Sequence, residues 1–238
     1  IRCGVVELDE NTATSQYQRV RGGKTYFNLK VSGASSGGGY KDISSAIVIN
    51  NNLNITGTST FDTASKGVSG NAGLTMDGGR WRNSKSSTAQ PELVASATPY
   101  SLTGGVMDFY GSDVGIQPIK GTYGATLPIV YKNIEITGTN VGKSNSNITL
   151  GTSGTFTVKN GGTFIINDDT ITSVDATASV TVENNGTFKT GNKKGFSGFT
   201  ATFSDNSSIH SSISNITLDT NSIVDYTGTG QIISQGTL

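Results

Sequence analysis

The amino-acid sequence predicts an all-β protein, and within that class a right-handed parallel β-helix, also called a β-solenoid. Short runs of alternating apolar and polar residues occur along the whole chain, and turn residues (Gly, Asn, Asp and Ser) bound these runs. One nine-residue pattern is also repeated, which is typical of solenoids. A series of β-sandwich repeats is the alternative, because sandwiches also consist of many short strands joined by turns.

The alternating pattern predicts twelve short strands rich in β-branched and aromatic residues. In chain order they cover residues 26–33, 46–50, 53–57, 73–78, 106–111, 133–138, 147–151, 156–161, 163–167, 179–186, 199–204 and 215–219. Residues 87–100 contain Pro91 and Pro99, so we interpret this stretch as a loop or capping excursion instead of a helix.

The nine-residue pattern explains why a solenoid is favoured over other all-β folds. It reads LNITGTSTF at residues 53–61, FTVKNGGTF at 156–164 and VTVENNGTF at 180–188, with Phe at the ninth place each time. Phe164 and Phe188 lie 24 positions apart (188 − 164), which suits one coil of a β-helix. Coils stack at about 4.8 Å, so equivalent apolar residues would form a continuous inner column.

A longer repeat divides the chain into two halves. YFNLKVSG at residues 26–33 matches YKNIEITG at residues 131–138, 105 positions later (131 − 26). We therefore expect residues 1–238 to form a single β-solenoid segment made of two similar units, at about 20–125 and 126–238. Since such units occur in series, we expect the segment to be a fragment of a longer chain.

The composition excludes several classes of partner. The 238 residues are 33% hydrophobic and 14% charged, with 17 Lys and Arg, 17 Asp and Glu and a formal net charge of zero. No excess charge would attract nucleic acid or an anionic membrane. No window approaches the roughly 18 apolar residues of a membrane span, so we expect no nucleic-acid partner and no membrane insertion by this segment.

The residues between 104 and 138 carry a resemblance to a known family. An aliphatic-x-Phe-x-Gly strand is followed by Gln and an aliphatic residue, a loop, and an aromatic-x-Asn-aliphatic-x-Ile-x-Gly strand. These places are held by Val106, Phe109, Gly111, Gln117, Ile119, Tyr131, Asn133, Ile134, Ile136 and Gly138. The order resembles the unit of large repetitive surface adhesins of Bacteroidetes, the gliding-adhesin type exported by type IX secretion. The resemblance covers about residues 20–190, and Pro118 departs from it.

This resemblance implies an extracellular, cell-surface location and a role in adhesion or gliding motility. The implied partners are neighbouring repeats of the same chain, other surface proteins and surface polysaccharide. Bacteria of this group attach O-glycans at Asp-Ser/Thr followed by a small or aliphatic residue. Asp-Thr-Ala at residues 62–64 and Asp-Thr-Ile at 169–171 fit that pattern, which makes Thr63 and Thr170 candidate O-glycan attachment sites.

The stretches that resemble metal-binding or nucleotide-binding motifs are better interpreted as structural elements. Cys3 and His210 are the only residues of their types, so they cannot supply a Cys/His metal cluster. The stretch GTNVGKS (138–144) resembles a P-loop, but its first Gly is one residue too close and no helix former follows, so we interpret it as a Gly-rich turn. Asn-Asp-Asp at 167–169 is typical of an Asx-turn at a coil corner. We expect no catalytic residue, cofactor or metal.

Arg80, Trp81 and Arg82 form the one conspicuous basic and aromatic cluster. A sugar could stack on Trp81 beside the two arginines, or the indole could cover the end of the core. Our leading hypothesis is a non-enzymatic extracellular segment that forms a rigid stalk or filament. The alternative is a carbohydrate-binding or polysaccharide-degrading β-helix domain. An enzyme would gather three or more charged side chains into one groove, whereas a stalk would scatter them.

Overall fold

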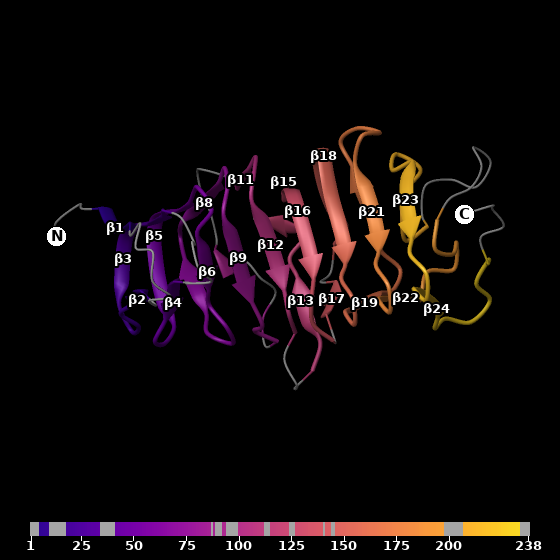
Figure 1. Cartoon of the computed structure of the whole chain (residues 1–238), viewed down its shortest axis with the longest axis horizontal. Coiled ribbons are helices and arrows are strands. Elements are labelled where there is room, and N and C mark those ends of the chain that lie inside the picture. The colour runs from indigo at the N-terminus through magenta and orange to yellow at the C-terminus, as the bar shows by residue number, and fades with distance from the viewer. Residues whose placement is uncertain are drawn as a thin grey trace.

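The computed structural model describes residues 5–9, 18–33, 41–86, 88, 92–93, 100–111, 115–123, 127–139, 141–143, 146–197 and 207–233. Within these residues the chain forms strands and no helix. Strand after strand is stacked along one long axis, from β1 at one end to β23 and β24 at the other (Figure 1). The predicted strand at 199–204, the two prolines of the 87–100 excursion and Cys3 lie outside the described residues.

Three parallel sheets run along this axis. Sheet A has the order β1-β3-β5-β7-β10, with β8 pairing β5 and β11. Its strands are β1 (Val5–Asp9), β3 (Thr25–Ser32), β5 (Ile47–Ile55), β7 (Val68–Gly70), β8 (Gly73–Met76), β10 (Glu92–Leu93) and β11 (Ser101–Leu102).

Sheet B is the longest, with the order β2-β4-β6-β9-β12-β16-β18-β21-β23 and with β20 pairing β18. Its strands are β2 (Gln18–Val20), β4 (Lys41–Ile43), β6 (Thr60–Asp62), β9 (Arg80–Asn83), β12 (Val106–Phe109), β16 (Val130–Ile136), β18 (Ile148–Val158), β20 (Ile171–Ser173), β21 (Ser179–Val182) and β23 (Asn215–Leu218).

Sheet C has the order β13-β17-β19-β22-β24. Its strands are β13 (Gln117–Ile119), β17 (Val141–Lys143), β19 (Thr163–Ile166), β22 (Thr187–Thr190) and β24 (Ile223–Tyr226). The described residues contain one antiparallel pair, β14 (Thr122–Tyr123) with β15 (Leu127–Pro128), in the loop before β16.

The predicted fold is confirmed: the chain is an all-β parallel solenoid. The β-sandwich alternative is wrong, because sandwich sheets are antiparallel whereas all three of these sheets are parallel. Successive residues of a strand point to opposite faces, and β19, β21 and β22 each alternate half-buried and buried side chains. The alternating sequence pattern therefore separates the core from the surface.

The inner column consists of like residues stacked on like residues. Phe164 of β19 pairs with Phe188 of β22, and their ring centroids are 5.3 Å apart in an edge-on arrangement. Phe156 and Phe196 continue the column at 4.7 and 4.9 Å. Such edge-on pairs are the preferred aromatic geometry. The prediction of stacked apolar columns is confirmed for Phe164 and Phe188.

Phe61 holds the same place in its unit but lies on another sheet. It belongs to β6 of sheet B and pairs with Trp81, with ring centroids 6.1 Å apart. The two matched strands 105 positions apart behave likewise, because β3 lies in sheet A and β16 in sheet B. Both carry a register shift after the tyrosine, between Tyr26 and Asn28 and between Tyr131 and Asn133. The two copies of the repeat therefore share a local structure, but the strand of the first copy lies in sheet A and that of the second copy lies in sheet B.

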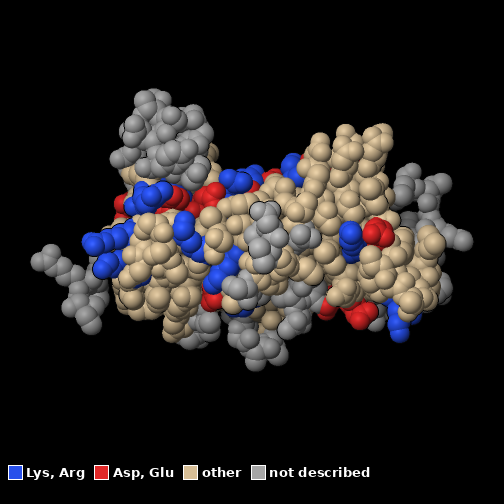
Figure 2. All heavy atoms as spheres, turned by 90° about the horizontal axis from the view of Figure 1, so that it is seen from below, with Lys and Arg blue, Asp and Glu red and all other residues tan. Residues whose placement is uncertain are grey.

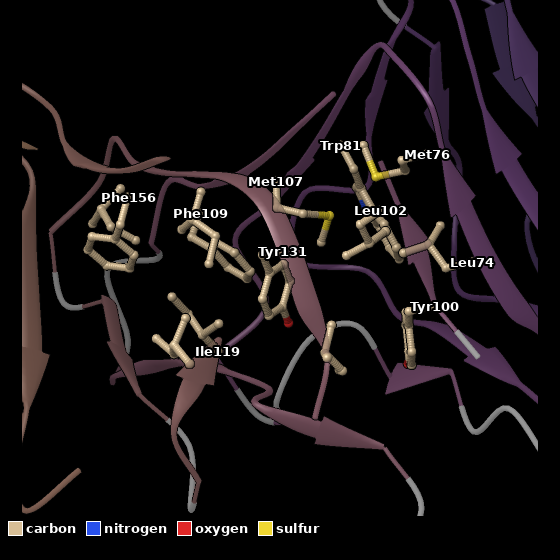
Figure 3. Close-up of a cluster of buried hydrophobic side chains, with 14 of the residues drawn as sticks. Leu74, Met76, Trp81, Tyr100, Leu102, Met107, Phe109, Ile119, Tyr131 and Phe156 are labelled. Carbon is tan, nitrogen blue, oxygen red and sulfur yellow. The ribbon is translucent and has the colours of Figure 1, made fainter. Parts of the chain in front are cut away.

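The change from sheet A to sheet B takes place at strand β12. It pairs with β9, the last sheet B strand of the first copy, and with β16, which matches β3 of sheet A. A cluster of large side chains fills the core at this point, where Tyr131 lies beside Phe109 and Ile119 (Figure 3). Tyr131 is fully buried and its hydroxyl donates to the Lys120 carbonyl, so this phenol has a partner inside the core.

Candidate binding face

The outward face of sheet B carries a continuous row of charged residues. Each occupies the position paired with the next, one strand further along the stack. We call this row, together with Arg80, the charge ladder; it consists of Arg19, Asp42, Asp62, Arg82, Asp108, Glu135 and Arg80. Figure 2 shows blue and red atoms close together along the upper part of the molecule, from its left end to its centre.

Asp108 is the centre of the charge ladder. Its side chain is only 3% exposed, and its Oδ2 lies 3.0 Å from Arg82 Nε and 3.2 Å from Arg80 Nη1. The hydroxyl of Thr137 donates to Oδ1 at 2.6 Å. One buried carboxylate thus accepts from two guanidinium groups and a hydroxyl, the arrangement that a buried charge requires.

Arg80 joins Asp108 to the next acidic residue along the row. Its Nη1 donates to Glu135 Oε2 at 2.6 Å, across 55 residues of sequence. Burial disfavours the guanidinium cation, but the hydrogen bond and charge of Glu135 and the charge of Asp108 outweigh it. The pKa of Arg80 is consequently raised above its usual value. Arg80 therefore remains a cation that holds two neighbouring carboxylates together.

Asp62 is held from three directions. Arg82 Nη1 donates to Oδ2 at 3.2 Å, while the Tyr110 hydroxyl and the Ala64 backbone N–H donate to Oδ1 at 2.8 and 2.9 Å. The Arg82 guanidinium also lies 4.6 Å from the centroid of the Tyr110 ring, a cation–π contact. Burial, with a smaller contribution from Asp62, raises the pKa of Tyr110 to about 12, so this phenol donates at neutral pH.

At the N-terminal end of the row, Arg19 makes a two-pronged contact with Asp42 at 2.9 and 2.7 Å. Arg19 is 63% exposed, so water competes for this pair far more than for those around Asp108. The charge ladder therefore has a water-shielded centre and a solvated end.

Trp81 does not lie on this face, which corrects the prediction that it could stack on a sugar. Its side chain is fully buried, because alternation along β9 points Arg80 and Arg82 outward and Trp81 into the core. The indole N–H donates to the Thr63 hydroxyl at 3.0 Å. Arg80 and Arg82 stay about one-third exposed and are the parts of the predicted cluster that a ligand could reach.

Thr63 and Thr170 are not presented as glycan sites by the folded chain. Thr63 is fully buried and accepts hydrogen bonds from Trp81 and from the Asn83 amide at 2.8 Å. Thr170 is 5% exposed, and its backbone N–H donates to Asn147 Oδ1. A glycosyltransferase needs an accessible hydroxyl, so the burial of these two residues in the folded chain argues against the predicted attachment at Thr63 and Thr170.

The remaining sequence motifs have local structural roles. Val141–Lys143 of the P-loop-like stretch form strand β17, which corrects our interpretation of that stretch as a turn. Asn167 and Asp168 are exposed at a bend, as expected for a coil corner. His210 lies beside a turn, where its Nδ1 accepts from the Ser212 backbone N–H at 2.9 Å.

Sequence reasoning missed the acidic half of the charge ladder. Asp62, Asp108 and Glu135 come from β6, β12 and β16, whereas the predicted cluster comprised only Arg80, Trp81 and Arg82. Asp108 and Glu135 each sit between two apolar residues, and Asp62 follows Phe61, which is the signal available in the sequence. Their convergence could not be derived without the pairing register.

A shallow pocket of about 430 Å³ opens on the molecule apart from the charge ladder. Its lining is mainly aliphatic and hydroxyl-bearing: Leu102, Thr103, Val130, Lys132, Gly151, Thr152, Ser153 and Val174. The Lys132 ammonium donates to the Thr152 carbonyl at 2.7 Å. No ligand class is indicated by this lining.

Among the described residues, no group of three or more His, Cys, Asp or Glu side chains is arranged to hold a metal ion. The described part of the chain also contains no helix long and apolar enough to cross a membrane. Searches among protein families, curated proteins and solved structures found no match to this chain.

Proposed function

We propose that this chain is a non-enzymatic, extracellular segment of a cell-surface protein, in which the solenoid forms a rigid stalk with an adhesive role. The observation that supports this most directly is the mutual pairing within the charge ladder. Asp62, Asp108 and Glu135 each contact an arginine of the same face, which stiffens neighbouring strands and leaves these charges engaged. Stacked coils with cross-strand pairing on their surface suit a load-bearing rod.

The proposed location follows from the resemblance to the repetitive gliding adhesins of Bacteroidetes. That resemblance rests on the ordered motif from Val106 to Gly138, in which the Gln and the two strands occupy defined places in the coil. We infer from it export by type IX secretion and display at the cell surface. Neighbouring repeats and other surface proteins are the inferred partners.

An antibody against this segment, applied to intact cells of the organism that encodes it, tests the location and the role together. We expect labelling without lysis, loss of the epitope on mild external proteolysis, and reduced attachment of cells to surfaces when the antibody is present. Labelling that requires lysis, or attachment unaffected by saturating antibody, would contradict the proposal. An antibody against a cytoplasmic protein serves as the control for intact cells.

A second candidate function is polysaccharide binding or cleavage on the same face. The specific observation in its favour is that three carboxylates lie beside two guanidinium groups on this face, since polysaccharide lyases and hydrolases need carboxylates and basic residues close together on one face. Retention of polysaccharides by the immobilised protein, and release of reducing ends, would be compared between the native chain and Arg80→Ala. The matched control is Arg19→Ala at the solvated end. Retention lost only in Arg80→Ala favours this candidate, and equal retention in all three contradicts it.

A further inference from the structure

Strand β24 repeats β1 and β12, which we call opening strands because each pairs with one of the two matched strands, β3 or β16. Both opening strands lie before the unit starts expected at about 20 and 126, so we place the start of each unit at its opening strand. β1 and β12 share an aliphatic residue, an inward apolar residue, an outward acid and a second inward apolar residue, and β24 has the same order. The four places are held by Val5, Val6, Glu7 and Leu8 in β1, by Val106, Met107, Asp108 and Phe109 in β12, and by Ile223, Val224, Asp225 and Tyr226 in β24.

A glutamine fastens β12 and β24 to the preceding coil in the same way. Gln117 Oε1 accepts from the Gly111 backbone N–H at 2.8 Å, and its amide donates to the Asn83 carbonyl at 2.8 Å. Gln231 Oε1 accepts from the Gly228 backbone N–H at 2.5 Å, and its amide donates to the carbonyls of Thr190 and Asn192 at 2.9 and 3.0 Å. In each case the glutamine closes the turn after the opening strand and reaches back to the end of the strand beneath it.

The ion pair beneath each opening strand is also repeated. Asp108 of β12 pairs in register with Arg82 of β9, at 3.0 Å between the charged groups. Asp225 of β24 pairs in register with Lys189 of β22, at 3.7 Å. Both basic residues follow the aromatic residue of the core column, Trp81 or Phe188. Three separate features therefore place β24 as the equivalent of β12.

The sheet that carries the opening strand changes by one at every copy. β1 lies in sheet A, β12 in sheet B and β24 in sheet C. In the first two copies the next strand of the same face pairs directly on the opening strand, Asn28–Val31 on β1 and Ile134–Ile136 on β12. We propose that residues 223–233 begin a third unit, and that the outer edge of β24 is the docking site for the next strand of that unit.

The partner is thus a further unit of the same layout, which extends sheet C and starts another sheet beside it. Its first docking strand has the form aromatic-x-Asn-aliphatic-x-aliphatic, with the two aliphatic residues above Val224 and Tyr226. Among the described residues, β24 is the last strand of sheet C. Ile233 is 68% exposed, whereas Ile119, which follows Gln117 by the same two positions, is fully buried beneath β17.

This inference deepens the proposed function and rests on it in one respect, namely that the segment is part of a long stalk. It predicts the geometry of that stalk, since each unit of about one hundred residues turns the opening strand to the next sheet. Adhesive surfaces on successive units would point in different directions around the axis. A failure of the intact-cell labelling would leave the geometry standing, and a failure of the experiment below would leave the location standing.

The test extends the chain with its own sequence. Residues 120–190, which follow Ile119, are fused after Ile233 in place of residues 234–238. Hydrogen exchange at the amides of β24 is expected to slow by at least about tenfold relative to the unextended chain, because a strand pairs on its free edge. Cysteines replacing Asp225 and the grafted copy of Glu135 should form a cross-link, since these positions would be neighbours in register.

The matched control places the first cysteine at Thr217 on β23 of sheet B, which should not cross-link to the graft. A folded graft with unchanged exchange at β24, or a cross-link to Thr217 in place of Asp225, would overturn the proposal. If the fusion does not fold, a synthetic peptide of residues 128–139 is added to the native chain. Protection confined to β24 supports the proposal, and none at millimolar peptide refutes it. A peptide with Ile134→Asp and Ile136→Asp is its control.

Discussion

The Asp108→Ala substitution tests the physical basis of the charge ladder. It removes the one carboxylate that both Arg80 and Arg82 share, and leaves the Thr137 hydroxyl without its acceptor. Removing one partner of a buried ion pair is costly because the other charge keeps its desolvation without its attraction. We expect a clear loss of stability without loss of the fold, since the inward residues of β12 are unchanged.

The size of the loss follows from burial. A hydrogen bond to a charged group contributes about 1.5–3 kcal/mol, and Asp108 accepts three. Arg80 and Arg82 are 32% and 34% exposed, so water partly replaces the lost carboxylate and reduces the cost. The expected decrease in the free energy of unfolding is about 3 kcal/mol, at the lower end of the range for a broken buried pair.

Trp81 is the single tryptophan of the chain and is fully buried beneath this face, so its fluorescence during urea unfolding reports the change. The matched control is Asp42→Ala, which breaks the solvated pair with Arg19 and should cost less than about 1 kcal/mol. The reasoning is refuted if Asp108→Ala and Asp42→Ala destabilise the protein equally. A double-mutant cycle of Arg82→Ala with Asp108→Ala should give a favourable coupling above about 1 kcal/mol.

Three further predictions concern other parts of the coil. Gly138→Ala should lower the free energy of unfolding in urea by about 3 kcal/mol or more, because the added Cβ would lie 1.6 Å from the backbone carbonyl oxygen of Tyr110. The control Gly161→Ala adds a Cβ in open space at φ +73° and should cost about 1 kcal/mol. Thr63→Val removes a buried acceptor of the Trp81 indole and should cost about 2 kcal/mol with a shifted emission maximum; an unchanged spectrum would contradict this. Burial raises the pKa of Tyr110 to about 12, so the contribution of this phenol to stability is complete below pH 10 and is lost as the pH rises towards 12. The absorbance at 295 nm of the native protein, minus that of the Tyr110→Phe variant, should therefore titrate near pH 12 and not near pH 10.

The sequence was sufficient for the fold because each coil repeats its own local pattern. The alternation in SVTV and the ninth-place Phe of FTVKNGGTF and VTVENNGTF predicted inward columns, and Phe164 does pair with Phe188. The position of Trp81 could also have been derived, since Arg-Trp-Arg on an alternating strand cannot point all three side chains outward.

The candidate site was not predictable in the same way. Arg80 meets Glu135 across 55 residues, and that meeting depends on the loop excursion between β9 and β12 and on the hairpin before β16. Loop lengths set the register, and a change of one residue would move a side chain to the opposite face. The sequence repeats therefore specify the column, whereas the surface face depends on irregular segments that carry no periodic signal.

The order of charges along sheet B indicates that the stacking of strands limits which charged residues can occupy its outward face. Strict repetition would place identical charges about 4.8 Å apart, where two like charges repel by about 3 kcal/mol at an effective dielectric constant near 20. The row instead reads Arg19, then the acids Asp42 and Asp62, then Arg82, then the acids Asp108 and Glu135. Every acid in it touches an arginine, and Arg80 reaches diagonally to relieve the last acidic pair.

Beyond Glu135 the same row continues as Thr157, Thr181 and Thr217, which are uncharged and can stack without repulsion. A solenoid can thus maintain an outward row either by giving each acid an arginine partner or by repeating neutral residues. The most buried charged residue of the row, Asp108, lies on β12, between β9 and β16. These are the strands at which the second unit joins the first. In the observed register Asp108 lies opposite Arg82, and a shift of β12 by one residue would turn Asp108 toward the core, away from both arginines. The charge ladder is therefore best understood as a device that sets the register where one unit joins the next.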